Sequence, residues 1–357
     1  MRKWMHIMML ALLMLAVSCE KRPLMELSNT HYVRVYVDEE IRNVTTGFYD
    51  GENVRPEYKS PDVLRVMLAD PETGQIRAER FLRNKGQDEG GLYYDGYIIA
   101  DPGEYALLAY NFDTESTIIG TANNHYEAKA YTNEIASHLK TKIPSRRTKT
   151  PESGIDECIA YDPDHLFAAS CGNVCIPYVE HIDTLRTPDG GYFQAKSIVR
   201  SYYLQVRVKG IQYASSSVGL LTGMSGSAWI HSGEMDEEHD VTVYFEMLPG
   251  DSSSAGLKRS NNDEAVIYTT FDTFGKIPDA ENELEITFDF LTVYGKSHSE
   301  TFDISDVFST PEAKENQWLL LDHVIEIPEP PPGTGADGSG FQPSVGEWED
   351  IESDIIL

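Results

Sequence analysis

The sequence predicts an all-β protein built as two β-sandwich domains in tandem. Three observations lead to this prediction: many short runs are rich in β-branched and aromatic residues, turns of Gly, Pro and Asp separate these runs, and helical periodicity is scarce. Without alternating helices, such strands form sandwiches or barrels rather than a parallel sheet. A chain of 357 residues has room for about two domains.

The first domain is expected over residues 30–190. Its clearest strands are 31–37 (HYVRVYV) and 63–68 (VLRVML), and the turn 70–74 (DPETG) joins the second of these to the next strand as a hairpin. The other strands expected here are 75–82, 93–99, 105–112 and 174–179, and a short helix is expected over 131–139.

The second domain is expected over residues 191–327, beginning at the Gly190-Gly191 turn. Residues 328–340 (PEPPPGTGADGSG) then form a spacer that is stiff first and flexible afterwards. The strands expected in this domain are 198–208, 227–231, 241–248, 265–271, 284–294 and 318–327.

The N-terminus has the pattern of an export signal. Arg2 and Lys3 precede an unbroken apolar run over 7–17, which is too short to span a bilayer as a helix. The run ends in LAVSC at residues 15–19, which resembles the lipobox of bacterial lipoproteins, although Ala16 stands where that family usually has Leu. The alternative is an ordinary signal peptide with an incidental cysteine.

The lipobox resemblance implies a cleaved signal peptide over residues 1–18 and a mature chain that begins at a lipidated Cys19. The lipid, including palmitate, would anchor the protein firmly in the outer membrane, because stable anchoring needs only two such signals. Residues 19–29 would then be a tether. No acidic run follows Cys19, so the periplasmic and cell-surface faces of that membrane stay open as alternatives.

The charge of the chain excludes one class of partner. Acidic residues outnumber basic ones 58 to 29, for a formal net charge of −29. This field repels phosphate backbones, so a nucleic-acid partner is not expected. Docking on anionic lipid through protein charge is disfavoured for the same reason.

Four short stretches carry a family resemblance. Residues 101–107 (DPGEYAL), 161–167 (YDPDHLF), 199–204 (VRSYYL) and 221–227 (LTGMSGS) resemble the lipid-anchored branch of the fimbrillin superfamily in Bacteroidetes. The chain is most similar to lipoproteins of unknown function related to fimbrial anchor subunits. The resemblance implies two stacked transthyretin-like domains and a role at the base or tip of a surface filament. None of the four motifs is catalytic.

The remaining cysteines are Cys158, Cys171 and Cys175. In an oxidising compartment we expect one disulfide, from Cys158 to Cys171 or to Cys175, and one free thiol. The alternative is a zinc site formed by Cys171 and Cys175 with His165 or His181. The three residues between these two cysteines are a loose spacing for zinc, so no metal or cofactor is predicted.

Three other patterns have both a chemical and a structural interpretation. Residues 223–227 (GMSGS) come close to the G-x-S-x-G nucleophile motif, but a strand rather than a helix follows, which favours a simple turn. Asp162, Asp164 and Asp251 could bind calcium, although the spaced loop motif is absent. The 20 Tyr and 4 Trp residues would form either a sugar-binding face or cross-strand pairs, and pairs are favoured.

The C-terminal segment 341–357 combines acidic residues with large apolar ones, so we expect it to dock on another surface. Trp348, Ile351 and Ile355 are the predicted docking residues, and their spacing allows a short helix as well as a strand. The segment either packs on its own domain or donates a strand to a partner.

Three functional hypotheses follow. The first is a non-enzymatic, lipid-anchored surface protein of fimbrial-anchor type, which fastens or terminates a filament or adhesive assembly with pilin-like or other surface subunits as partners. The second is a lipid-anchored module that binds a glycan or another extracellular ligand. The third is a periplasmic hydrolase, which is disfavoured because no catalytic motif is complete.

Overall fold

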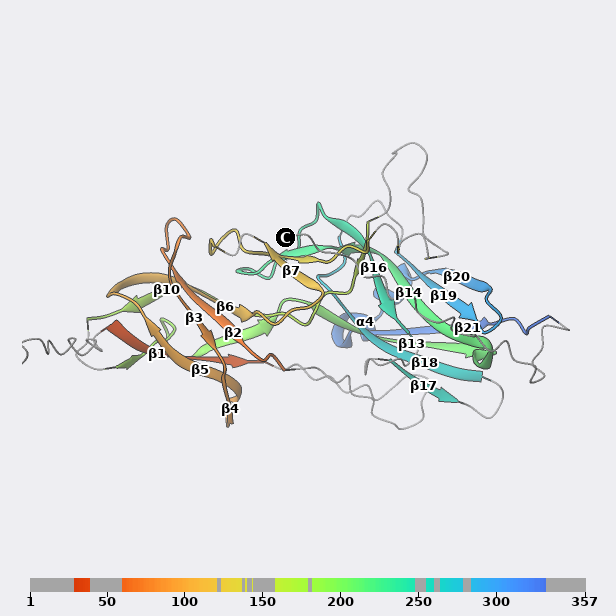
Figure 1. Ribbon diagram of the computed structural model, residues 1–357, viewed down its shortest axis with the longest axis horizontal. Coiled ribbons are helices and arrows are strands. Elements are labelled where there is room, and N and C mark those ends of the chain that lie inside the picture. The colour runs from red at the N-terminus through yellow and green to blue at the C-terminus, as the bar shows by residue number, and fades with distance from the viewer. Residues whose placement is uncertain are drawn as a thin grey trace, which may run out of the picture.

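The described chain is almost entirely β-structure, which confirms the predicted fold class (Figure 1). Two sandwiches lie end to end along the long axis of the molecule, with a small sheet between them on one side. The computed structural model describes residues 29–38, 60–120, 123–136, 139, 143, 158–178, 182–247, 255–259, 264–278 and 284–331.

The first sandwich consists of two layers, and strand β12 connects them by pairing with a strand of each. One layer has the order β3-β2-β6-β10 and the other the order β12-β1-β5-β4, and β12 pairs with both β10 and β1. The short strand β11 also pairs with β1. The bounds are β1 Thr30–Val37, β2 Leu64–Ala69, β3 Ile76–Leu82, β4 Asn84–Asp88, β5 Gly91–Ile99, β6 Gly103–Asn111, β10 Phe167–Ile176, β11 Asp183–Thr184 and β12 Phe193–Ser197.

The core of this sandwich follows the alternation of its strands. On β1, Val33, Val35 and Val37 point inward, and Tyr32, Arg34 and Tyr36, which alternate with them, lie on the other face. Strand β2 is buried along its whole length, because the small sheet covers its outer face. The predicted hairpin between β2 and β3 is present, and Gly74 at its turn has a φ of 72°.

The second sandwich packs a four-stranded sheet, β17-β18-β13-β21, on a five-stranded sheet, β20-β19-β14-β16-β9. Aliphatic and aromatic side chains form the core between them, and the rings of Phe245 and Phe271 stack at a centroid distance of 4.1 Å. The bounds are β9 Ile159–Tyr161, β13 Arg200–Lys209, β14 Ala214–Ser225, β16 Asp240–Glu246, β17 Ala255–Arg259, β18 Glu264–Thr273, β19 Glu285–Thr292, β20 Ser297–Asp303 and β21 Trp318–Glu326.

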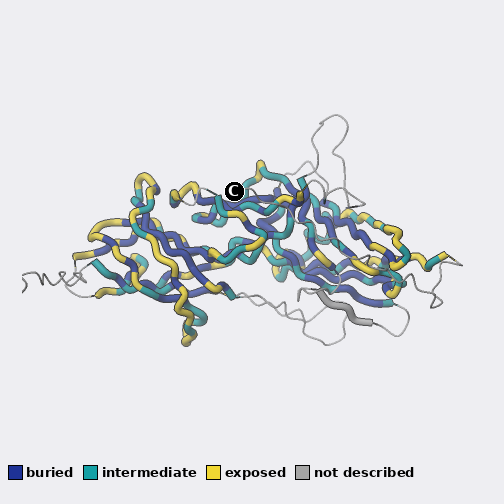
Figure 2. The backbone as a smooth tube through the Cα atoms, viewed as in Figure 1, coloured by how far each residue is buried: buried dark blue, intermediate teal, exposed yellow. Residues whose placement is uncertain are grey.

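A three-stranded sheet joins the two sandwiches. It has the order β15-β8-β7, with β7 at Thr117–Gly120, β8 at Lys129–Thr132 and β15 at Ser227–Trp229. Its apolar face belongs to a buried cluster that includes Met67 and Leu108 of the first sandwich and Phe274 of the second part of the chain. Figure 2 shows buried backbone in both sandwiches and in the segments between them.

Two strands belong to a different sandwich from the one expected from their position in the sequence relative to the Gly190-Gly191 turn. Strand β12, which follows Gly190-Gly191, belongs to the first sandwich. Strand β9, which precedes that turn by about 30 residues, pairs in parallel with β16 of the second sandwich. Parallel pairing also joins β1 to β12 and β13 to β21, although antiparallel pairs predominate.

The expected helix over 131–139 is wrong in its first part. Tyr131 and Thr132 lie in β8, and Glu134 makes a β-bridge to Ala160. Aromatic and β-branched residues favour a strand once partners exist on both sides, and β7 and β15 are those partners. The described helices are the single 3₁₀ turn η2 at Ile211–Tyr213, α3 at Ser305–Phe308 and α4 at Pro311–Asn316. No helix among the described residues has the length and apolar character needed to cross a bilayer.

Candidate functional site

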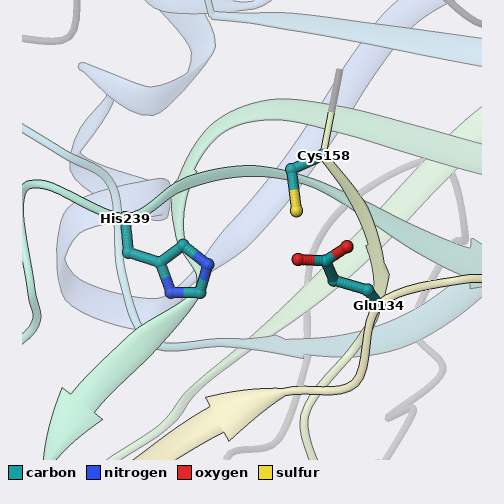
Figure 3. A group of neighbouring side chains, drawn as sticks. All are labelled: Glu134, Cys158 and His239. Atoms are coloured by element: carbon teal, nitrogen blue, oxygen red, sulfur yellow. The ribbon is translucent and has the colours of Figure 1, made fainter. Parts of the chain in front are cut away.

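Three chemically distinct side chains meet where the small sheet joins the second sandwich. They are Glu134, Cys158 and His239, whose potential ligand atoms all lie within 4.8 Å of one another. Glu134 is exposed, and the other two are half-buried. Figure 3 shows the sulfur, the carboxylate and one ring nitrogen of the histidine pointing toward a common space. We call these three residues the Cys–His–Glu cluster.

Strand pairing explains why distant residues meet here. β9 and β16 run parallel with Ile159 opposite Thr242, so both strands begin at the same end of the sheet, and Cys158 just before β9 and His239 just before β16 both lie at that end. The amide of Thr242 donates a 2.8 Å hydrogen bond to the Cys158 carbonyl. Glu134 reaches the same place because it bridges to Ala160 of β9.

The His239 ring is held from its other side. Its Nδ1 lies 3.2 Å from the hydroxyl of Ser227, and its ring centroid lies 6.1 Å from that of the Tyr131 ring. The ring also lies against Gly226, where a Cβ would be 3.0 Å from Cε1 and 3.1 Å from Nδ1. Glycine at position 226 therefore leaves the room that this ring occupies.

The Ser227 hydroxyl determines which nitrogen of His239 carries the proton. It donates a 3.4 Å hydrogen bond to the carboxylate of Asp236. The hydrogen bond from Lys129 lowers the pKa of Asp236, so this carboxylate is charged and only accepts. Since the hydroxyl proton points at Asp236, we assign the Nδ1 proton of His239 to the bond with Ser227. The lone pair of Nε2 then faces Cys158 and Glu134.

Residues 223–227, whose sequence comes close to the nucleophile motif, contribute to this site in a different way. Residues 223–227 join β14 to β15, so a strand follows the serines and no nucleophile elbow forms. Instead, Gly226 and Ser227 position the imidazole. Neither Glu134 nor His239 was predicted as a site residue, because their proximity depends on two long-range strand pairings.

Among the described residues, Cys158, Cys171 and Cys175 form no disulfide in this structure. Cys158 packs against the core of the second sandwich and Cys171 against that of the first, so the two are parts of different units. Cys171 and Cys175 both lie on β10, on either side of an irregularity in its pairing with β6.

The alternative zinc ligands lie apart as well. His165 contacts Ser201 and Asp272 rather than these cysteines, with Nδ1 distances of 3.3 and 3.7 Å. His181 lies outside the described residues.

The residues considered for calcium have structural partners. One carboxylate oxygen of Asp164 accepts hydrogen bonds from three successive backbone amides, those of Glu115, Ser116 and Thr117, at 2.6–2.9 Å. It therefore shapes the loop before β7. Burial raises the pKa of Asp162, and Asp251 lies outside the described residues.

Tyrosine residues form a ladder on the outer face of β1 and β5. Tyr32 faces Tyr97 across the two strands, Arg34 faces Asp95, and Tyr36 faces Tyr93. The Arg34 guanidinium lies 3.8 Å from the centroid of the Tyr93 ring. These are cross-strand pairs of the kind predicted, although Tyr97 is still 53% exposed. We call this face the tyrosine ladder.

A polar groove of about 900 Å³ lies between the two sandwiches. Its walls come from β10 and β12 on one side and from the 230–237 loop on the other. Its charged and titratable lining residues are Lys196, Arg200, His231, Glu234 and Glu237.

The remaining predicted site residues cannot be placed. Cys19 and the docking residues Trp348, Ile351 and Ile355 all lie outside the described residues.

Comparison with solved structures finds a similar fold in other proteins. A crystal structure titled a "putative adhesin" from Bacteroides ovatus is 18% identical and has a TM-score of 0.50, with 88% of this chain and 98% of that chain covered. The fimbrial anchor protein Mfa2 from Porphyromonas gingivalis is 11% identical with a TM-score of 0.40, covering 79% and 85%.

Sequence comparison identifies the family. Residues 18–246 match the family described as "Domain of unknown function (DUF5119)", and the chain belongs to this family. It is also 22% identical over 297 residues to the "Putative fimbrium anchoring subunit Fim4B" of Bacteroides ovatus, covering 78% of this chain and 80% of that protein. The predicted relationship to fimbrial anchor subunits is thereby confirmed.

Proposed function

We propose that this protein is a non-enzymatic, lipid-anchored cell-surface protein that fastens or terminates a fimbrial filament. The observation that carries the proposal is its similarity to a fimbrium anchoring subunit over about four-fifths of both chains. Similarity over that length includes both sandwiches, so the relationship does not depend on one shared module.

The sheet edges supply surfaces that suit such a role. Among the described strands, β21 pairs only with β13, and β20 pairs only with β19. An edge strand offers main-chain donors and acceptors to an incoming strand, which is one way in which extended segments are recognised. Side chains on β20 alternate between exposed and half-buried, so a partner strand would find a regular surface there.

Membrane attachment is proposed to depend on the lipid on Cys19. Changing Cys19→Ala should release the exported protein from the outer-membrane fraction into the soluble fraction. The matched control is Cys171→Ala, which also removes one thiol but should leave membrane attachment unchanged. Retention of Cys19→Ala in the membrane would contradict lipid anchoring.

The fimbrial role is tested by whether filaments stay attached to the cell and whether filament subunits co-purify with this protein. Cells that produce only the Cys19→Ala variant should shed filaments into the medium, and the native protein purified from membranes should carry filament subunits with it. The measurements are electron microscopy of the cells and mass spectrometry of the purified complex. If filaments remain attached and no filament subunit co-purifies, the anchoring role is wrong even where lipidation is present.

The C-terminal segment is proposed to take part in docking through Trp348, Ile351 and Ile355. Replacing all three by Ser should abolish recovery of filament subunits while leaving the melting temperature unchanged, if the segment binds a partner. A large fall in melting temperature would instead indicate that the segment packs on its own domain. Unchanged recovery and unchanged stability would contradict any docking role.

A glycan- or ligand-binding function is the second candidate, and the tyrosine ladder is the observation that favours it. Exposed aromatic rings can stack on the apolar faces of a ligand, and the hydrogen bonds of Arg34 to Tyr32, Tyr36 and Asp88 hold the rings of this face in place. Tyr97→Ala removes the most exposed ring of this face and should weaken binding to an immobilised glycan array. Val293→Ala, at another exposed apolar position on the second sandwich, is the control.

A further inference from the structure

We propose that the Cys–His–Glu cluster is a zinc site that ties β9 to β16 and to the end of β8. This inference goes beyond the fimbrial role and does not depend on it. Glu134, Cys158 and His239 supply an oxygen, a sulfur and a nitrogen ligand from three separate segments. Sulfur, imidazole nitrogen and carboxylate oxygen are the side-chain ligands of protein zinc sites.

The chemistry of the ligands favours zinc over a hard cation. Ca²⁺ takes six to eight oxygen ligands, and this cluster has one carboxylate. With a thiolate, a carboxylate and a neutral imidazole, Zn²⁺ forms a complex with no net charge at the protein. Binding replaces the thiol proton of Cys158 by the metal, and that proton passes to the buffer.

The spacing is close to what tetrahedral coordination requires. Zinc bonds of 2.0–2.3 Å place ligand atoms roughly 3.3–3.8 Å apart, whereas the three atoms here lie within 4.8 Å. Coordination of zinc therefore requires the ligand atoms to move toward one another by about an ångström. Glu134 is the exposed member, so solvent surrounds part of the side chain that would move, and water completes the fourth position.

The histidine is already oriented as a ligand. Histidines that bind metals commonly donate the second ring N–H to a polar partner, which sets the tautomer and the direction of the lone pair. Here Ser227 accepts from Nδ1, Asp236 accepts from Ser227, and Lys129 neutralises Asp236. Gly226 provides the space for the ring.

A bound metal would fasten a short edge strand. Strand β9 has three residues and lies at the end of its sheet, so few ladder hydrogen bonds hold it. Zinc would link Cys158 before β9 to His239 before β16, and would close the chain between Glu134 and Cys158 into a loop. A ligand that binds only the folded state stabilises it by an amount that grows with the logarithm of the ligand concentration divided by its dissociation constant.

The test is a zinc titration of the metal-free full chain, kept reduced with a phosphine. Calorimetry should show one equivalent of Zn²⁺ bound, with release of one proton, and the melting temperature should rise on binding. Cobalt in place of zinc should produce a thiolate charge-transfer band. Cys158→Ala should abolish that band and weaken zinc binding by more than about 100-fold, and Ser227→Ala should weaken it about 10-fold.

Cys171→Ala is the matched control, because Cys171 is also a half-buried cysteine outside any disulfide but lies on β10. It should retain the cobalt band, the stoichiometry and the affinity. Melting temperatures of the metal-free variants show whether each one is folded. The proposal is overturned if the folded chain binds no zinc, if Cys158→Ala binds it as tightly as the parent chain, or if Cys171→Ala weakens binding equally.

Discussion

The carboxyl group of Asp162 lies in surroundings that disfavour its charge. Removal from water is the main reason that the pKa of Asp162 rises to about 7, and the nearby Asp272 and Asp164 carboxylates raise this pKa further. In the unfolded chain the group titrates near its ordinary pKa of 3.8. The folded state therefore holds an additional proton between about pH 4 and pH 7.

This proton makes the stability contribution of Asp162 fall as the pH rises. The contribution is fully present below the unfolded pKa and is lost as the pH rises through about 7. We predict that Asp162→Asn, which has no charge at any pH, gains stability relative to the parent chain by up to about 1.4 kcal/mol per pH unit in this window. Denaturant titrations at pH 5 and pH 8 measure the difference in unfolding free energy between Asp162→Asn and the parent chain. The same difference at both pH values would contradict the prediction.

Gly219 on β14 is required by a close approach in the second core. A Cβ at this position would overlap the ring of Phe245, which is buried and stacked on Phe271. We predict that Gly219→Ala lowers the free energy of unfolding by about 1–3 kcal/mol, because the ring has no space to move away.

Gly172→Ala is the control for this effect, since a Cβ at position 172 meets nothing within 4 Å. Its change should stay within about 0.5 kcal/mol of zero. Urea denaturation measures both variants. If the two substitutions lower the free energy of unfolding equally, overlap with Phe245 does not cause the destabilisation by Gly219→Ala.

At the scale of single elements, two long strands depend on their partners more than on their own composition. Strand β14 has 12 residues, yet its sequence ASSSVGLLTGMS contains many small residues of low strand propensity, and it was not predicted. It forms because β16 and β19 pair with it on both sides. The same reasoning explains β10, which begins at Phe167 and was predicted to begin only at residue 174.

The short helix α4 depends on its N-cap, the residue just before Pro311. Thr310 has extended backbone geometry, and its hydroxyl accepts a 3.2 Å hydrogen bond from the Ala313 amide. It also donates to the Val307 carbonyl at 2.7 Å. We predict that Thr310→Ala lowers the free energy of unfolding by about 1 kcal/mol, because both groups lose their partner.

Thr310→Ser keeps the hydroxyl and should retain most of this stability. The comparison is made by thermal denaturation of the two variants under the same conditions. A Ser variant as unstable as the Ala variant would show that the methyl group, rather than the cap, is responsible.

At the scale of the whole molecule, the two sandwiches share one apolar contact region. The cluster around the small sheet combines Met67, Leu108 and Tyr110 from the first sandwich with Ala228 and Phe274 from the later part of the chain. An apolar contact of this kind couples the unfolding of neighbouring domains, because opening it exposes surface on both of them.

We predict that Phe274→Ala destabilises the molecule by about 3–5 kcal/mol and separates its unfolding into two transitions. The buried ring is 3% exposed, so its removal leaves a cavity at the junction. Differential scanning calorimetry tests this. Phe308→Ala is the control, because Phe308 packs only against the core of the second sandwich and its loss should lower stability without dividing the transition.

The sequence by itself determined the all-β class, the hairpin at residues 70–74 and most strands with alternating apolar residues, since these depend on local periodicity and turn chemistry. Its four short motifs also indicated the relationship to fimbrial anchors. Tertiary structure alone decided the residues of the Cys–His–Glu cluster. Cys158 and His239 are 81 positions apart in sequence and meet because β9 and β16 pair in parallel, and Glu134 joins them through one bridge to β9. Such pairings depend on register between distant strands, which no local pattern encodes.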